Sequence, residues 1–247
     1  MKHVLCVLAL CAIAVPLVAA DLSMLATAAA QGPLQQLEKR FQQPGHSIKV
    51  QFDTSPNITK RLAAGEMPDV LVAQTATIDR LVQEGRAMGN TRAAIGKIGV
   101  GVAMGKGACH PDISTADTLK ASLLQADAVV YSQGASGLLV EAMLKKIGVA
   151  DQIKSKVVQL PSGSDVMQRL GTGSGNQIGF TMVSEIKLGE SFGGSLVGPL
   201  PAAIQTYTAY EAVVLSSSKA PDVARAYVRA IVTPEARKVF TSAGWEF

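Results

Sequence analysis

Residues 48–73 read IKVQFDTSPNITKRLAAGEMPDVLVA, and this stretch decides the class of fold. Residues 48–52 alternate like a strand, and residues 70–73 form a continuous apolar strand. Between them, Ser55 and Pro56 are typical of an N-cap followed by proline at the first helical position, and a glycine ends the helix. A strand, a helix and a strand in this order predict a right-handed crossover unit of a parallel sheet that helices cover on both faces.

The same alternation continues along the chain, so the predicted fold is α/β. Further strands are predicted at residues 22–26, 98–104, 128–131, 157–160, 178–182 and 209–215, and helices at residues 33–41, 78–82, 114–124, 136–147, 165–170, 221–231 and 234–243. The long apolar strand and two helices at the end of the chain predict a return to the first part of the fold. We therefore expect two lobes joined by two crossovers, with residues 21–95 and 207–247 in lobe 1 and residues 96–206 in lobe 2.

Residues 1–20 have the pattern of a secretory signal peptide. A basic start is followed by an apolar run over residues 4–18 and by small residues up to Ala20, after which we expect cleavage. Pro16 and Asp21 make the run shorter than the roughly 20 residues of a membrane-spanning helix. A membrane anchor and a lipoprotein modified at Cys11 are the alternatives. The pattern predicts export to the periplasm.

Composition excludes several classes of function. After residue 20 the chain keeps one cysteine, Cys109, and two histidines, His46 and His110, which predicts no disulfide, no metal site and no cofactor. The net charge is +4, and the lysines and arginines form no basic run, which argues against a nucleic-acid partner. We expect no catalytic residues. An exported α/β hydrolase is an alternative, although no Gly-x-Ser-x-Gly turn follows a predicted strand.

Small and hydroxyl-bearing residues fill the turns from strand to helix at residues 28–32, 54–57, 132–137 and 162–165. Ligands of open α/β sheets bind beyond the carboxyl ends of the strands, where helix N-termini offer free N–H groups to anions. Ser55 and Ser164 could instead be plain helix caps, and the glycines could be plain turn residues. Taken together, these turns predict a site for a small anion built from backbone amides and hydroxyls.

The chain resembles the periplasmic molybdate-binding proteins and their relatives among the type II solute-binding proteins of ABC transporters. The residues that carry the resemblance are LSMLATAAA at 22–30, TSPNITKRLAAG at 54–65, PDVLV at 68–72 and TPEARKVF at 233–240. The resemblance implies two lobes, each a mostly parallel sheet flanked by helices. It also implies that a small anionic ligand is delivered to the membrane permease of an ABC transporter. We expect a monomer. A ligand-sensing module of the same fold is the alternative, and a neighbouring transporter operon would discriminate the two.

The resemblance also assigns a ligand site. In that family serine hydroxyls, backbone amides and a tyrosine hydroxyl hold the oxyanion, and here Ser55 keeps one serine, whereas Ala29 and Met182 replace the other serine and the tyrosine. Each such hydrogen bond contributes about 1.5–3 kcal/mol, so we expect an organic acid in preference to molybdate, which remains the alternative. Arg92 is a candidate partner for a carboxylate. The full predicted set is Ala29, Ala30, Gln31, Thr54, Ser55, Asn57, Arg92, Ser136, Gly137, Ser164 and Met182.

Overall fold

The computed structural model describes residues 20–41 and 46–247. Most of the predicted signal peptide, residues 1–19, lies outside the described residues. The strands are β1 (Ala20–Thr27), β2 (His46–Asp53), β3 (Val70–Gln74), β4 (Ala93–Gly105), β5 (Ala128–Ser132), β6 (Val157–Leu160), β7 (Gln177–Met182), β8 (Gly194–Pro199) and β9 (Tyr207–Val214). The helices are α1 (Gln31–Phe41), α2 (Ser55–Ala63), α3 (Thr75–Gln83), α4 (Ala116–Gln125), α5 (Ala135–Lys146), α6 (Ala150–Ile153), α7 (Gly163–Thr172), α8 (Val183–Gly189), α9 (Pro221–Ala230) and α10 (Pro234–Ser242), with short 3-10 turns that include η1 (Ala28–Ala30) and η4 (Glu190–Phe192).

The strands form a continuous sheet in the order β2-β1-β3-β9-β4-β7-β5-β6, and β8 pairs with β4. Strands β1, β2 and β3 are parallel to one another, as are β5, β6 and β7. Strands β4 and β9 lie between these two parallel groups and are antiparallel to their neighbours. The predicted α/β fold with parallel sheets and flanking helices is confirmed.

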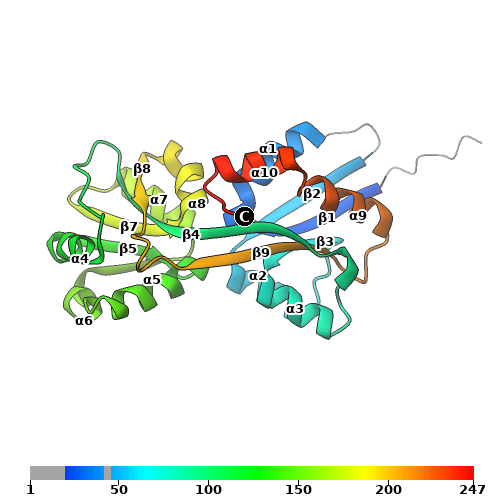
Figure 1. Cartoon of the computed structure of the whole chain (residues 1–247), viewed down its shortest axis with the longest axis horizontal. Helices are drawn as coiled ribbons and strands as arrows, with labels where there is room; N and C mark the ends of the chain where they lie inside the picture. The colour runs from blue at the N-terminus through cyan, green and yellow to red at the C-terminus, as the bar shows by residue number, and fades with distance from the viewer. Residues whose placement is uncertain (1–19, 42–45) are drawn as a thin grey trace, which may run out of the picture.

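Two halves are visible on either side of the middle of the molecule (Figure 1). The terminal half consists of β1–β3, α1–α3, α9 and α10, and the middle half consists of β5–β8 and α4–α8. Strand β4 runs through both, because its residues 93–99 pair with β9 and its residues 100–103 pair with β7. Strand β9 also pairs with β3, and α9 packs on β1 and β9. The last part of the chain therefore packs against the first part.

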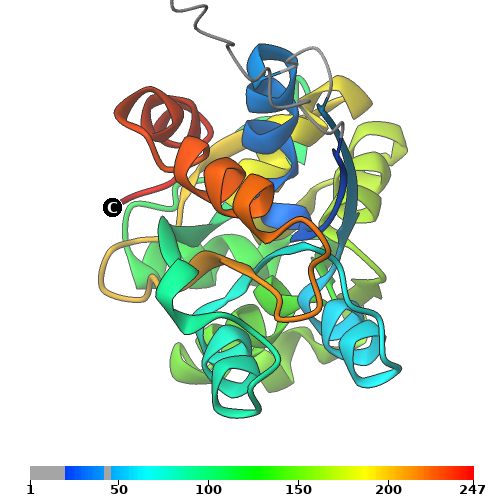
Figure 2. The same ribbon diagram turned by 90° about the vertical axis from the view of Figure 1, so that its right-hand side faces the viewer.

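The inner strands β3, β5 and β7 are buried on both faces, as continuous apolar strands require, whereas the edge strand β2 exposes Lys49 and Gln51. In β1, Met24 and Leu25 point to opposite faces: Met24 belongs to the same apolar cluster as Leu34 of α1, and Leu25 to the same cluster as Ile58 of α2 and Leu81 of α3. Figure 2 shows the result end-on, with α1, α9 and α10 on one side of the sheet and α2 and α3 on the other. No helix in the described part of the chain is long and apolar enough to cross a membrane.

Two local predictions are corrected. Residues 183–206 carried no predicted element, whereas the structure places α8 and β8 there. Ser55 was predicted to be the N-cap of its helix, but the helix begins at Ser55 and its N-cap is Thr54, which makes no capping hydrogen bond through its side chain. The hydroxyl of Ser55 is consequently not used for capping.

Candidate functional site

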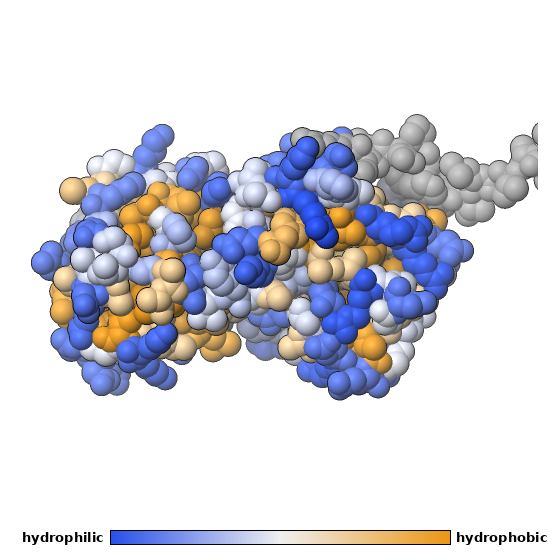
Figure 3. Space-filling model, in the orientation of Figure 1, coloured by the Kyte–Doolittle hydropathy of each residue, from blue (hydrophilic) through white to orange (hydrophobic). Residues whose placement is uncertain are grey.

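Two neighbouring cavities lie where the halves meet, and the outline of the molecule is notched between the halves (Figure 3). The inner chamber has a volume of about 20 Å³ and the outer chamber about 350 Å³. Both are lined by Ala28, Thr54 and Glu185. The inner chamber is also lined by Thr27, Ala29, Ser55, Ser132, Gly134, Ala135, Ser136, Gly163, Met182 and Tyr210. The outer chamber is also lined by Gln31, Phe52, Asp53, Ser162, Ser164, Leu188, Gly189, Ser191 and Phe192.

The lining residues come from the turns that follow the strands. Strands β1 and β2 lead into η1 and α2 from the terminal half, and β5, β6 and β7 lead into α5, α7 and α8 from the middle half. The carboxyl ends of parallel strands lie at one edge of a sheet, so the turns of each half meet in one place. The N-termini of α2, α5 and α7 are therefore at the site, with their unpaired backbone N–H groups.

Hydroxyl groups of the middle half form a buried chain. The Ser132 and Ser136 Oγ atoms are 3.0 Å apart, and the Ser136 Oγ is 3.4 Å from the Thr181 Oγ1. The Thr181 hydroxyl donates to Oε2 of Glu185. All three hydroxyl residues are 3% exposed or less. A hydroxyl both donates and accepts, so this chain can change its hydrogen-bond direction to suit a ligand.

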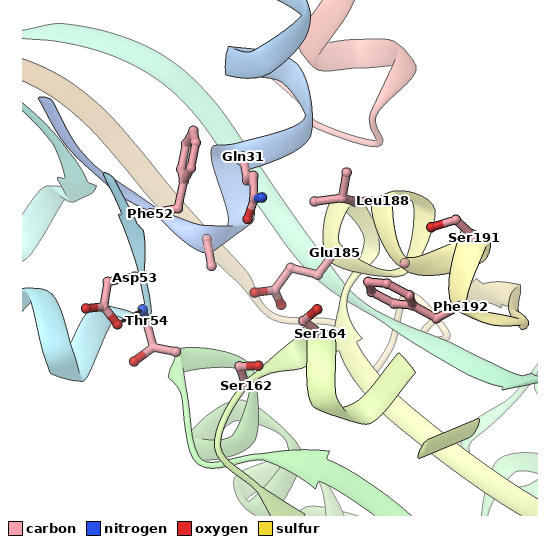
Figure 4. A pocket seen from close by; sticks show the side chains of 12 residues that line it. Gln31, Phe52, Asp53, Thr54, Ser162, Ser164, Glu185, Leu188, Ser191 and Phe192 are labelled. Carbon is pink, nitrogen blue, oxygen red and sulfur yellow. Dashed lines mark hydrogen bonds between the residues drawn. The ribbon is translucent and has the colours of Figure 1, made fainter. Parts of the chain in front are cut away.

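Glu185 is the carboxyl group at the centre of the site. It projects from the N-terminal turn of α8 into the cavity, near Ser164 and Gln31 (Figure 4). Its Oε2 accepts hydrogen bonds from the Thr181 hydroxyl and from the backbone N–H of Met182 at 3.2 Å. Burial nevertheless raises the pKa of Glu185, because these two hydrogen bonds only partly replace hydration.

Gly163 leaves room for this carboxyl group. A Cβ atom at position 163 would lie 2.3 Å from the Thr181 Oγ1 and 2.6 Å from the Glu185 Oε2. Both distances are shorter than a van der Waals contact. Glycine at the first position of α7 therefore allows Glu185 to reach Thr181.

Tyr210 brings a hydroxyl group from β9 to the inner chamber. Its side chain is 1% exposed, and the polar side chains of Thr27, Ser55 and Gln74 lie near its hydroxyl. Burial raises the pKa of Tyr210 to about 12, and the nearby Glu185 adds to the effect. The phenol is therefore neutral at pH 7 and is a hydrogen-bond donor for an anion.

We expect Tyr210→Phe to weaken ligand binding about tenfold, because one neutral hydrogen bond contributes about 1.4 kcal/mol when its partner stays behind. Tyr207→Phe is the matched control, since Tyr207 lies on the same strand but is 42% exposed and lines neither chamber. Calorimetric titration of both variants checks the expectation. Equal affinities of the two variants would place the Tyr210 hydroxyl outside the binding site.

Among the described residues, no lysine, arginine or histidine lines either chamber, and no group of side chains could hold a metal ion. Asp53, the second carboxylate of the lining, accepts hydrogen bonds from the Asn57 amide at 2.9 Å and from Arg61 at 3.3 Å. Arg61 also pairs with Glu66 at 2.6 Å, so both of its partners belong to the protein. An anion in this site would be held by amides and hydroxyls.

Arg92 does not reach the site, so its predicted role as a carboxylate partner is corrected. Its guanidinium group is 2.6 Å from Glu211 and 2.7 Å from Asp79, and the hydrogen bonds that it donates to Glu211 are the main cause that raises the pKa of Arg92. Because two carboxylates already pair with this guanidinium group, its electrostatic attraction for a ligand anion is weak. Arg92 lies directly before β4, and its ion pair with Glu211 joins it to β9.

The structure brings most of the other predicted residues together and leaves some apart. The residues that line a chamber are Ala29, Gln31, Thr54, Ser55, Ser136, Ser164 and Met182. The residues that line neither chamber are Ala30, Asn57 and Gly137. Ala30 is fully buried, Asn57 is bonded to Asp53, and the Cα of Gly137 faces the carbonyl oxygen of Ser132.

Sequence reasoning missed the groups that matter most for the chemistry of the site. Glu185 and Tyr210 were not predicted, nor were the apolar residues Phe52, Leu188 and Phe192. One signal could have found Glu185: it lies three residues after the predicted end of a strand, at the position where a carboxylate accepts from the N-cap backbone N–H. No local signal marks Tyr210, which lies within a strand.

Comparisons with known proteins agree with this architecture. The model of the bacterial extracellular solute-binding protein family matches residues 22–246. An aconitate isomerase of a Pseudomonas species is 31% identical over 193 residues, which are 78% of this chain and 72% of that protein. The Azotobacter vinelandii periplasmic molybdate-binding protein has a TM-score of 0.75 and 17% identity, with 92% of this chain and 99% of that chain covered.

A further solved structure, the sulfate-binding protein SubI of Mycobacterium tuberculosis H37Rv, has a TM-score of 0.71 and 19% identity, with 91% of this chain and 86% of that chain covered. At these identities the likeness to solved structures concerns the fold, and it confirms the type II periplasmic binding protein architecture that the sequence predicted. The family match extends over nearly all of the described residues. The chain is therefore a member of the bacterial extracellular solute-binding protein family.

Proposed function

We propose that this protein binds a small organic acid between its two halves and delivers it to the membrane permease of an ABC transporter. One observation carries the choice of an organic acid. The inner chamber has room for little more than one small group and contains several hydroxyl side chains, and it shares lining residues with an outer chamber of about 350 Å³ whose walls include both apolar and polar side chains. A tetrahedral oxyanion would leave the outer chamber empty, whereas an organic acid has a carboxylate for one chamber and carbon for the other.

The inner chamber suits a carboxylate head. The backbone N–H groups at the start of α2 and α5 and the hydroxyls of Ser55, Ser136 and Tyr210 are donors from both halves. Dipoles and hydroxyls stabilise an anion without a buried countercharge. A lining without cationic side chains, as the described part of the chain provides, is therefore compatible with an anionic ligand.

The outer chamber suits the carbon skeleton of the ligand. Phe52 of β2 lies on one side of it, and Leu188 and Phe192 lie on the other (Figure 4). Leu188 is 39% exposed and Phe192 is 45% exposed, so covering them with carbon would remove apolar surface from water. Asp53, Gln31 and Ser191 add polar groups, which would select among acids with further substituents.

Closure of the halves would trap the ligand. The proposed lobes are residues 21–95 with 207–247 and residues 96–206, so that β4 and β9 are the crossovers. The hydrogen bond from the Ser184 hydroxyl to the Ala29 carbonyl oxygen at 2.6 Å joins the two proposed lobes. A ligand that touches both lobes favours the closed state. The proposed location is the periplasm, after cleavage of residues 1–20, and the protein is proposed to act as a monomer.

A thermal-shift screen tests the proposed ligand class. Succinate, citrate and trans-aconitate are compared with molybdate, tungstate and sulfate. A ligand present at 100 times its dissociation constant should stabilise the protein by about 2.7 kcal/mol, which is a clear shift of the melting temperature. A shift with the carboxylates alone supports the proposal. A shift with the oxyanions alone would contradict the organic acid and keep the solute-binding role.

Isomerisation of an unsaturated acid is a second candidate function. The observation that favours it is Glu185, a carboxyl group that lines both chambers and whose pKa is raised by burial, together with the identity to an aconitate isomerase. In a 1,3-proton shift, an ionised Glu185 would take a proton from a CH₂ group of the substrate as the double bond moves. It would then return the proton to the other end of the allylic system, so that no other reactant is consumed.

Proton NMR of trans-aconitate in D₂O tests this candidate. Appearance of the cis isomer, or exchange of the CH₂ protons, with the wild-type protein and at least 100-fold less with Glu185→Gln would support a catalytic Glu185. Glu190→Gln is the control, because Glu190 is exposed and lines neither chamber. A wild-type protein that binds trans-aconitate without isomerisation or exchange would exclude the candidate.

A further inference from the structure

We propose that the protein takes up one proton with each anion it binds, and that Glu185 holds this proton and donates it in a hydrogen bond to the ligand. The inference rests on the first proposed function, the binding of a small organic acid between the halves. Glu185 would then select ligands that can accept a hydrogen bond from its neutral carboxyl group.

The two oxygens of Glu185 have different surroundings. Oε2 accepts from the Thr181 hydroxyl and from the Met182 N–H, and it lies against the backbone of Gly163. Within the described part of the chain no donor bonds to Oε1, although the side chain lines both chambers. A neutral carboxylic acid has the same asymmetry, with one carbonyl oxygen that accepts and one hydroxyl that donates. Oε1 is therefore placed to donate into the cavity.

The charges around Glu185 favour the neutral form when an anion is present. The titratable groups that face it are Tyr210 of β9, which is neutral, and Asp53 of β2, which lines the outer chamber with it. Lys187, on the same helix, bonds to the carbonyl oxygen of Ser242 and lines neither chamber. A bound carboxylate and the carboxyl group of Glu185 would lie close together in this site. Two such groups do not both stay ionised when they are close and poorly hydrated, so Glu185 is expected to be neutral in the complex.

The pH dependence follows from this arrangement. Burial already raises the pKa of Glu185 in the free protein, and a bound anion raises this pKa further. The affinity is then greatest below the pKa of Glu185 in the free protein. Above that pKa the affinity falls about tenfold for each pH unit, until the pH exceeds the pKa of Glu185 in the complex. A ligand held by amides alone would show no such dependence where its own carboxylates are fully ionised.

Calorimetry measures the proton directly. Citrate and trans-aconitate are titrated into the wild-type protein between pH 7 and 9, in buffers that differ in ionisation enthalpy. We expect uptake of up to one proton per ligand, and an affinity that falls as the pH rises. Glu185→Gln should bind without proton uptake and with an affinity independent of pH, because the glutamine amide donates from one atom and accepts on the other.

Glu190→Gln, an exposed change of the same charge, should keep the proton uptake of the wild-type protein. Binding by the wild-type protein with no proton uptake at any of these pH values would overturn the inference and leave the proposed binding function intact. Lack of binding by any carboxylate would overturn both. If Glu185→Gln fails to fold, the number of protons that the wild-type protein takes up per bound ligand still tests the inference. Since a general base has to be ionised in the complex, proton uptake would also argue against the isomerase candidate.

Discussion

Gly137→Ala is expected to destabilise the protein by about 3 kcal/mol or more, although a single methyl group is added. The Cβ of an alanine at this position would lie 1.7 Å from the carbonyl oxygen of Ser132 and 2.9 Å from its carbonyl carbon. These atoms are backbone atoms at the end of β5, and no change of side-chain rotamer relieves such a clash. The turn from β5 to α5, which carries Ser136, would have to move.

This expectation corrects the interpretation of Gly137 from the sequence. The resemblance implied that Gly137 offers its backbone to the ligand, whereas its Cα faces the end of β5 and the residue lines neither chamber. Loss of binding in a Gly137 variant would thus follow from loss of the turn, and the melting temperature would fall in the absence of ligand as well.

Gly32→Ala is the matched control, because Gly32 also lies in the first turn of a helix, α1. A Cβ at position 32 would lie 3.8 Å from the nearest atom of Leu188, which is an ordinary contact. Alanine in place of glycine in a helix stabilises by up to about 1 kcal/mol, and Pro33, which disfavours the helical conformation of the residue before it, offsets part of this gain. Denaturant unfolding of both variants measures the difference, and equal stabilities would contradict the close approach of Gly137 to Ser132.

The alternation of strands and helices could be predicted from the sequence because the inner strands are buried on both faces and the edge strand β2 alternates. Continuous apolar stretches such as residues 70–73 have this cause, and the glycine, proline and serine residues between them mark the turns. The position of the site followed from topology, since the turns after parallel strands gather at one edge. Ser55, Ser136 and Ser164 were predicted for this reason, and all of them line a chamber.

The residues that were missed acquire their roles through long-range contacts. Helix α8 is short and directly follows β7, so the sequence VSEIKLG showed no separate helical pattern, and Glu185 was overlooked with it. Tyr210 reaches the site because β9 pairs with β3 in a register that places Tyr210 opposite Gln74. Arg92 is neutralised by Glu211, which lies 119 residues away in the chain. Local patterns contain no information on such pairs.

A disulfide across the site is expected to trap the ligand. Thr54 of the terminal half and Gly134 of the middle half approach each other at the inner chamber, and a Cβ at position 134 would lie 3.8 Å from the Cβ of Thr54. This separation is typical of the two Cβ atoms of a disulfide. The φ angle of Gly134 is −78°, which any residue adopts. Cysteines at both positions should therefore form a bond that holds the halves together.

The variant is made with Cys109→Ser, which removes the exposed free cysteine of the described chain. Oxidation after loading with ligand should slow ligand release by about 100-fold or more, because release requires the halves to separate. Oxidation of the empty protein should block binding to the same degree. Reduction should restore the exchange, and the variants with a single cysteine should exchange as the reduced protein does.

The rate of exchange of labelled citrate or trans-aconitate, before and after reduction of this disulfide, tests the central claim that the ligand lies between the two halves. The account predicts that exchange nearly stops in the oxidised protein and recovers when the disulfide is reduced. Exchange at the same rate in both forms, with the disulfide verified by mass spectrometry, would contradict a site between the halves.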